Sequence, residues 1–279
     1  MIINTNVSSI TAQEAAKNTN SKISSSLEKL STGLKINKAS DDASGLSIAD
    51  KLRTQATSLN QGVSNGNSAV TLLQIADKSM AEQSNILDTI KAKLIQANTD
   101  TTSDEGRNSI AKDVAALMEQ LNNIGKQTNY NGTQLISATN GTGASTALDF
   151  QVGESNTTGT ISLGAITANS TGLSLTSLDN ITTISKTGAE TAMGLVDTAI
   201  NTLNGFRADI GSTQNQVESA VRNLMTQATN VKAAESIIRD VDYAQESANF
   251  NKQNIISQAG SYAISQANSV QQNVLRLLQ

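Results

Sequence analysis

Residues 52–94 read LRTQATSLNQGVSNGNSAVTLLQIADKSMAEQSNILDTIKAKL, and this stretch decides the fold. A large apolar residue returns every seven positions, with Gly66 at the one missing step: Leu52, Leu59, Leu73, Met80, Leu87 and Leu94. Ala56, Val63 and Val70 form a companion series four residues after each of the first three steps. This spacing is the a/d seam of helices that pack along their length. We therefore predict one helix over about residues 42–98, about 80 Å long.

Two further segments show helical spacing on either side of a polar middle. Helices are predicted over about 107–126 and 189–238, where apolar residues recur at intervals of three and four. From 133 to 186 the composition shifts to Gly, Ser, Thr and Asn, which predicts a small β-hairpin region with loops. Within it, 148–152 and 160–163 alternate as short strands do. The sequence predicts a mainly α fold, a long antiparallel coiled-coil or bundle rod with this β region in mid-chain.

The two ends of the chain carry apolar stripes of their own. We predict that they form a paired terminal coiled coil, residues 1–41 and 241–279, with a rod domain of residues 42–240 between them. The stripe residues are Ile3, Val7, Ile10, Leu27, Leu30, Leu34, Ile256, Ala263, Val270, Val274 and Leu277. Isolated helices of this kind are weakly stable in water. We therefore interpret these residues as a polymerisation surface that neighbouring subunits cover.

Residue types missing from the chain narrow its function. The 279 residues include no His, no Cys and no Pro, and aromatic residues make up 2%. Without His or Cys, the usual general base, thiolate nucleophile and zinc ligands are absent. The absence of Pro suits long helices. We predict no catalytic, cofactor-binding or metal-binding residues. The net charge of −4 does not indicate binding to nucleic acid.

Asp41 and Asp42 stand immediately before the long helix. Carboxylates there can accept hydrogen bonds from the first free amide groups and favour the positive end of the helix dipole. We predict that both residues cap the helix, a simpler interpretation than a catalytic or ligand role. No stretch of the sequence approaches the about 20 apolar residues of a membrane helix, and the N-terminus lacks a secretory signal pattern.

Several long motifs resemble one family. Residues 29–49 read KLSTGLKINKASDDASGLSIA and closely resemble the N-terminal signature of bacterial flagellins, as does INTNVSS at 3–9. At the other end, DVDY at 240–243, QAG at 258–260 and QNVLRLL at 272–278 look like the C-terminal region of flagellins. The resemblance covers about residues 1–135 and 190–279, in the family's order. By this resemblance the chain is identified as a short form of the family without large outer domains.

The resemblance implies a function as well as a fold. It implies a subunit that self-polymerises into the secreted, extracellular flagellar filament and is exported unfolded by the flagellar type III apparatus. Its implied partners are copies of itself, the export apparatus, an export chaperone, and the filament cap and junction proteins, with neither nucleic acid nor membrane insertion. It implies no cofactor.

One departure from the family concerns immune recognition. Flagellins that activate the Toll-like flagellin receptor resemble LQRVRELAVQ where this chain reads LDTIKAKLIQ at 87–96. Thr89 replaces an Arg, Ala92 a Glu and Lys93 a Leu, which removes groups able to form charge-assisted contacts. We predict weak receptor activation.

Two alternatives remain open at this point. A hook–filament junction protein, from the same family, would join or cap rather than polymerise indefinitely. A non-flagellar coiled-coil signalling or adaptor protein would form a discrete soluble dimer, but it leaves the β-rich middle unexplained. An enzymatic function is disfavoured, since His, Cys and a phosphate-binding loop are all missing from the sequence.

Overall fold

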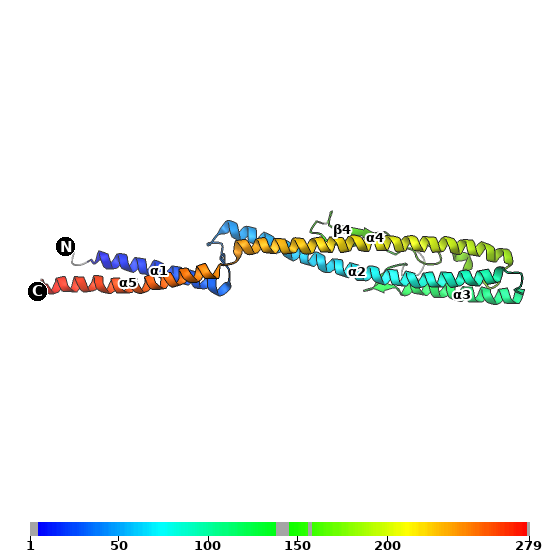
Figure 1. The fold of residues 1–279 in the computed structure, drawn as a ribbon, viewed down its shortest axis with the longest axis horizontal. Helices are drawn as coiled ribbons and strands as arrows, with labels where there is room; N and C mark the ends of the chain where they lie inside the picture. The colour runs from blue at the N-terminus through cyan, green and yellow to red at the C-terminus, as the bar shows by residue number, and fades with distance from the viewer. Residues whose placement is uncertain (1–4, 138–144, 156–157, 278–279) are drawn as a thin grey trace. The chain divides into compact units, whose positions relative to one another are not determined.

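The structure is a computed structural model that describes residues 5–137, 145–155 and 158–277, except the side chains of 274–277 (Figure 1). Long helices dominate it: α1 Val7–Thr32, α2 Ala43–Asn98, α3 Asp104–Gln127, α4 Lys186–Arg239 and α5 Tyr243–Leu277. The prediction of a mainly α fold is confirmed. The helices predicted over 42–98, 107–126 and 189–238 correspond to α2, α3 and α4 within three residues at each end.

Two antiparallel hairpins and a short 3-10 turn lie between α3 and α4. Strands β3 Leu148–Gln151 and β4 Thr160–Leu163 pair as the alternating pattern predicted. A smaller hairpin, β1 Asn129–Tyr130 with β2 Thr133–Gln134, begins before the predicted β region. Asn131 and Gly132 form the turn of this hairpin, and both residues have positive φ, 50° and 83°. The 3-10 helix η1 spans Thr176–Leu178.

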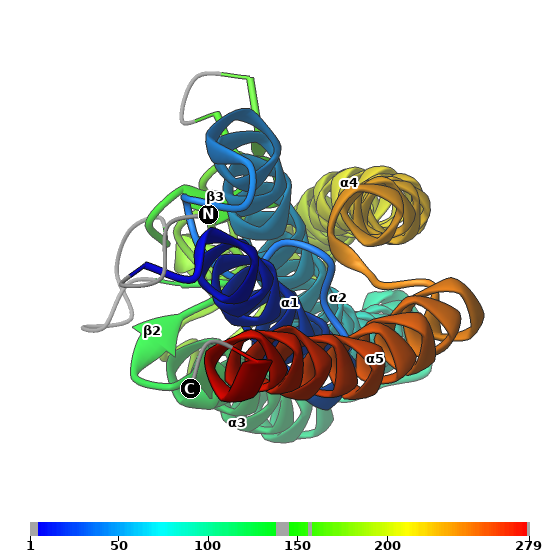
Figure 2. The same ribbon diagram turned by 90° about the vertical axis from the view of Figure 1, so that its left-hand side faces the viewer.

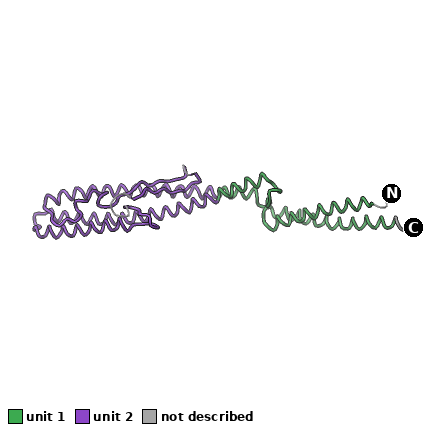
Figure 3. The backbone as a smooth tube through the Cα atoms, turned by 180° about the vertical axis from the view of Figure 1, so that it is seen from behind, with its two compact units in different colours: residues 1–56, 229–279 green, residues 57–228 purple. Residues whose placement is uncertain are grey.

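The chain divides into two compact units (Figure 3). Unit 1 holds residues 1–56 and 229–279, and unit 2 holds residues 57–228. The predicted division into a terminal part and a rod at residues 41 and 241 concerns their roles in a polymer, and it stays a prediction.

Unit 2 holds the large hydrophobic core, to which α2, α3 and α4 all contribute. Leu73, Met80, Leu87 and Leu94 of the predicted seam are completely buried there. The predicted companion series is only partly buried: Ala56 is buried, whereas Val63 and Val70 are half-buried and pack against the edge of the core. Its place is taken by Ala69, Ala76, Gln83, Ile90 and Ala97. Since α2 packs beside two helices in this unit, its buried stripe is wider than a simple a/d pair.

Unit 1 joins its helices through two short connections. Gly33 ends α1 in the left-handed conformation that favours glycine, with φ 75°. Beyond it, the Lys35 amide donates to Arg239 O at 2.6 Å and the Val241 amide donates to Gly33 O at 3.0 Å. The two connections therefore lie against each other as a short antiparallel bridge between Leu34 and Asp240.

The two predicted cap residues have different roles. Asp42 caps α2 as predicted, because its Oδ1 accepts from the Gly45 amide at 2.9 Å. Asp41 does not cap the helix. Its Oδ2 accepts from the amides of Asn37 and Lys38 at 3.0 and 3.1 Å, which closes the loop before α2. Those two hydrogen bonds hold the pKa of the Asp41 carboxyl below its ordinary value.

Two helical glycines should respond oppositely to alanine. At Gly62 an added Cβ would lie 2.1 Å from Val152 O of the β3–β4 hairpin, whereas at Gly205 it would meet nothing within 4 Å. We expect Gly205→Ala to stabilise the protein by about 0.5–1 kcal/mol, because alanine restricts the unfolded chain. Gly62→Ala should destabilise by about 1–3 kcal/mol, because the hairpin must move. Urea unfolding of both variants measures the two changes in the free energy of unfolding. Equal changes would contradict the packing of the β3–β4 hairpin on α2.

Within the described residues, every helix falls short of the apolar length that a membrane span requires.

Candidate assembly surface

The terminal helices α1 and α5 lie side by side in unit 1 (Figure 2). The inward positions of α1 alternate in steps of three and four: Ser9, Ala12, Ala16, Thr19, Ile23, Ser26 and Leu30. Those of α5 follow the same rule: Phe250, Gln253, Ser257, Gly260, Ile264, Ala267 and Gln271. Most of these side chains are small or polar. The seam between the two helices is therefore tight but poor in apolar area.

Polar contacts fix the register of this seam. At the N-terminal end of α1, Asn6 Nδ2 donates to Ala267 O at 3.1 Å, and near the middle of the helix Ser257 Oγ donates to Asn20 Oδ1 at 3.2 Å. At the other end the Tyr243 hydroxyl donates to Leu30 O at 3.0 Å. A Cβ on Gly260 would lie 4.0 Å from the Ala16 Cβ, so the helix axes approach closely there.

The residues predicted as the polymerisation surface lie mostly outside this seam. Val7, Ile10 and Leu27 on α1 are 61%, 54% and 55% exposed. On α5, Ile256 and Val270 are 42% and 53% exposed, and Ala263 is exposed too. Leu30 and Leu34 are half-buried, and Leu30 belongs to the inward seam. Ile3 and the side chains of Val274 and Leu277 fall outside what the structure describes.

The sequence interpretation missed further exposed apolar side chains in unit 1, among them Ile255, Tyr262 and Ile237. Ile255 is 67% exposed, Tyr262 74% and Ile237 83%. Ile255 and Tyr262 are seven residues apart, so they share one face of α5. Counting heptads from Ile255 as well as from Ile256 would have found this face.

Unit 1 has little apolar core of its own. Among its described residues, the buried apolar side chains are Ile36, Ala49 and Ala56, whereas Ser9, Thr19, Ser26 and Glu235 are buried polar ones. Burial of apolar area is the main favourable contribution to folding. The unit therefore exposes large apolar side chains while burying few, which is typical of a surface that another molecule covers.

The receptor-region departures lie in unit 2. Thr89 and Ala92 are exposed on α2, and the Thr89 hydroxyl donates to Asn85 O at 2.9 Å. Lys93 Nζ lies 2.7 Å from Asp113 Oδ2 of α3, and Lys91 forms an ion pair with Asp197 of α4. The two lysines are thus used to join α2 to its neighbours.

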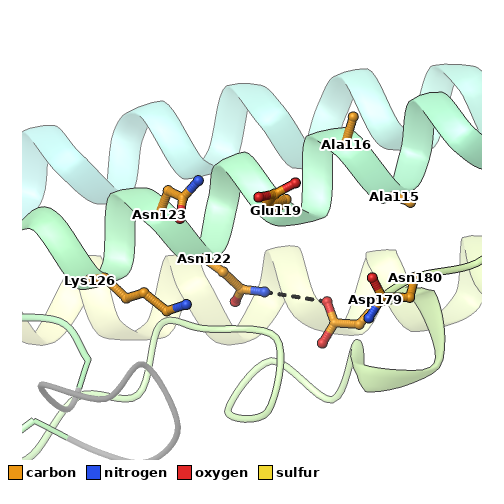
Figure 4. Close-up of a pocket in the computed structure, with 8 residues that line it drawn as sticks. All are labelled: Ala115, Ala116, Glu119, Asn122, Asn123, Lys126, Asp179 and Asn180. Carbon is orange, nitrogen blue, oxygen red and sulfur yellow. Dashed lines mark hydrogen bonds between the residues drawn. The ribbon is translucent and has the colours of Figure 1, made fainter.

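A polar groove of about 460 Å³ lies along α3, where the loop after η1 meets it (Figure 4). Asn122 uses both ends of its amide there, accepting from the Ser170 amide at 2.9 Å and donating to Asp179 Oδ1 at 3.3 Å. These contacts hold the loop on α3. Among the described residues no cluster of His, Cys, Asp and Glu could hold a metal ion.

The Asp100–Lys186 ion pair should give unit 2 a small acid-sensitive contribution to stability. Lys186 Nζ lies 2.7 Å from Asp100 Oδ1, and its hydrogen bond and charge hold the Asp100 pKa below the ordinary 3.8. The contribution is therefore present above pH 3.8 and is lost as pH falls through the folded pKa. Asp100→Asn should unfold at lower urea than the unchanged protein at neutral pH, and the gap should close in acid and shrink in high salt.

A double-mutant cycle with Lys186→Met is the control for this prediction. The two substitutions should not be additive at neutral pH, because each removes the same ion pair. If the effects of the two substitutions on stability were fully additive, the Asp100–Lys186 ion pair would not contribute to the stability of unit 2.

The fold and this surface define a class of protein, a helical subunit with paired terminal helices that expose large apolar side chains. The chain belongs to the bacterial flagellin family. The family model described as "Bacterial flagellin N-terminal helical region" matches residues 3–141, and "Bacterial flagellin C-terminal helical region" matches residues 193–278.

Relatives from several bacteria are similar over their full lengths. The "Flagellar filament 33 kDa core protein" of Treponema phagedenis is 35% identical over 285 residues, with all of both chains covered. "Flagellin" of Bacillus subtilis (strain 168) is 34% identical over 303 residues, again with both chains fully covered. The crystal structure of Bacillus cereus flagellin matches with a TM-score of 0.50 and 30% identity, covering 62% of this chain and 94% of that one.

Proposed function

We propose that this chain is a structural subunit that polymerises with copies of itself into the extracellular filament of a bacterial flagellum, for swimming motility. The observation that carries the proposal is that α1 and α5 expose Val7, Ile10, Ile255, Ile256 and Tyr262 outside a seam of mostly small or polar residues. Full-length similarity to a flagellar filament core protein supports it. The role is structural and needs no cofactor or catalytic residue.

Passage out of the cell in an unfolded state is part of the same proposal. The route is the flagellar type III apparatus, with an export chaperone on the C-terminal helical region and the cap and junction proteins as partners at the filament. The thin core of unit 1 supports this, because few apolar contacts have to be broken to unfold it. A chain without Pro also refolds without slow isomerisation.

Seeded polymerisation of purified monomer, followed by electron microscopy, tests the proposed function. The unchanged chain should form long filaments, and a chain lacking residues 1–40 and 241–279 should form none. Discrete oligomers from the unchanged chain would instead favour a junction protein or a coiled-coil adaptor.

Weak activation of the Toll-like flagellin receptor is a separate proposal. Thr89 and Ala92 offer no charge on the exposed face of α2, and the Lys93 ammonium is paired with Asp113. We expect Thr89→Arg, Ala92→Glu and Lys93→Leu together to raise potency in a reporter-cell assay by about tenfold or more, because each charge-assisted hydrogen bond contributes about 1.5–3 kcal/mol. Full potency of the unchanged monomer would contradict the proposal.

A further inference from the structure

The β1–β2 turn presents an Asn–Gly step in an unusual backbone conformation. Tyr130 pairs with Thr133, so Asn131 and Gly132 are the two central residues of the turn, with φ of 50° and 83°. Positive φ at both positions is typical of a type I′ turn, for which Asn–Gly is the favoured pair. Both residues are exposed, and a Cβ on Gly132 would meet nothing within 4 Å.

In an exposed Asn–Gly step, the backbone nitrogen of the glycine can attack the side-chain amide of the asparagine. The backbone nitrogen of Gly132 loses its proton and attacks Cγ of Asn131, and the new N–Cγ bond closes a five-membered imide. The Cγ–Nδ2 bond then breaks, and the side-chain nitrogen takes up that proton and leaves as ammonia. Water then opens the imide at either carbonyl and yields aspartate or isoaspartate. Because glycine has no Cβ, nothing on the following residue obstructs the approach. The only co-reactant is water.

The chain supplies a matched comparison for this step. Asn204 and Gly205 are also exposed, and Gly205 also has open space around its missing Cβ, but both lie inside α4. A helix fixes the backbone and engages the glycine amide in its hydrogen-bond ladder. That amide is then neither free nor oriented for attack.

A third Asn–Gly step is held more firmly still. Asn65 Nδ2 donates to Gln151 O at 3.0 Å and its Oδ1 accepts from Gln61 Nε2 at 2.9 Å, while Gly66 is buried in α2. The fourth step, Asn140–Gly141, lies outside the described residues.

We propose that Asn131–Gly132 is a site of spontaneous deamidation in the folded chain, and that the helical steps at Asn65 and Asn204 are protected. Isoaspartate adds a main-chain methylene and a carboxylate to a turn that has room for only two residues. The Tyr130–Thr133 pairing is lost with it. The hairpin leads directly into Leu135 and Ile136, 1% and 0% exposed, so the change reaches the edge of the unit 2 core.

Peptide mapping of the folded full-length monomer, aged in warm, mildly alkaline buffer, tests this proposal. Trypsin places Asn131 in peptide 127–186, Asn204 in 187–207 and Asn65 in 54–78. Asn131 should gain one mass unit over time, localised by fragmentation, with isoaspartate among the products. Asn204 and Asn65 should stay unchanged in the folded protein and begin to react once urea unfolds the chain.

Two results would overturn the proposal: an unchanged Asn131 in the aged monomer, or reaction of Asn204 at the same rate as Asn131. Asn131→Gly is the matched variant, since glycine keeps the positive φ and carries no side-chain amide. It should keep its helical circular dichroism and acquire no isoaspartate at the turn. Filament assembly does not enter the measurement, so the proposal stands or falls separately from the polymerisation function.

Discussion

A chain carrying Ile255→Ser and Tyr262→Ser together is expected to stay monomeric at concentrations where the unchanged chain forms filaments. The two side chains are 67% and 74% exposed and share one face of α5. Burying such a side chain contributes about 2 kcal/mol, so losing both should raise the critical concentration about a thousandfold.

The control for this prediction lies in the same helix. Gln258 and Ser265 are also exposed and seven residues apart, and Gln258→Ser with Ser265→Ala shortens two polar side chains instead. That variant should polymerise near the normal concentration, since exposed polar groups contribute little. Sedimentation of the polymer measures both, with circular dichroism of the monomer to show that α5 still forms. Normal assembly of the first variant would exclude this face from the subunit contact.

The long helices could be predicted from sequence because their cores are large and regular. Leu73, Met80, Leu87 and Leu94 recur every seven residues and are all completely buried. Pattern and burial agree there because the partner helices belong to the same chain.

The terminal helices were harder to interpret for the opposite reason. A search for apolar residues at heptad spacing in α5 selects Ile256, Ala263 and Val270, which are exposed. The seam with α1 lies on the neighbouring face, through Ser257, Gly260 and Ala267, where small residues permit close approach. Sequence periodicity reports that a face will be covered, but it does not distinguish a partner in the same chain from one in another.

The companion seam of α2 shows a second limit. A simple heptad predicts apolar residues at each step, yet Gln83 occupies one of them and is completely buried. A glutamine in a long polar-rich sequence gives no signal of burial. Its place becomes clear only when α3 and the loop after β4 are seen to present carbonyl groups to it.

Loss of the Gln83 amide should destabilise unit 2 strongly. Its Nε2 donates to Leu121 O of α3 at 3.1 Å and to Ala168 O of the loop at 2.8 Å, so one side chain joins three segments. Gln83→Ala leaves both carbonyls without this donor and opens a cavity in a well-packed core. We expect a loss of about 3–4 kcal/mol in the free energy of unfolding.

A second variant separates the two causes. Gln83→Met keeps most of the volume and removes the donor, and it also removes Oε1, which is buried without a hydrogen-bond partner. It should lose only about 1–2 kcal/mol, the share due to the hydrogen bonds. Gln74→Ala, an exposed glutamine on the same helix, should change stability by less than about 0.5 kcal/mol. Urea unfolding of the three monomers tests the ranking. If Gln83→Ala matched Gln74→Ala, the amide would not hold the loop and α3 together, because a buried donor with two partners cannot be removed without cost.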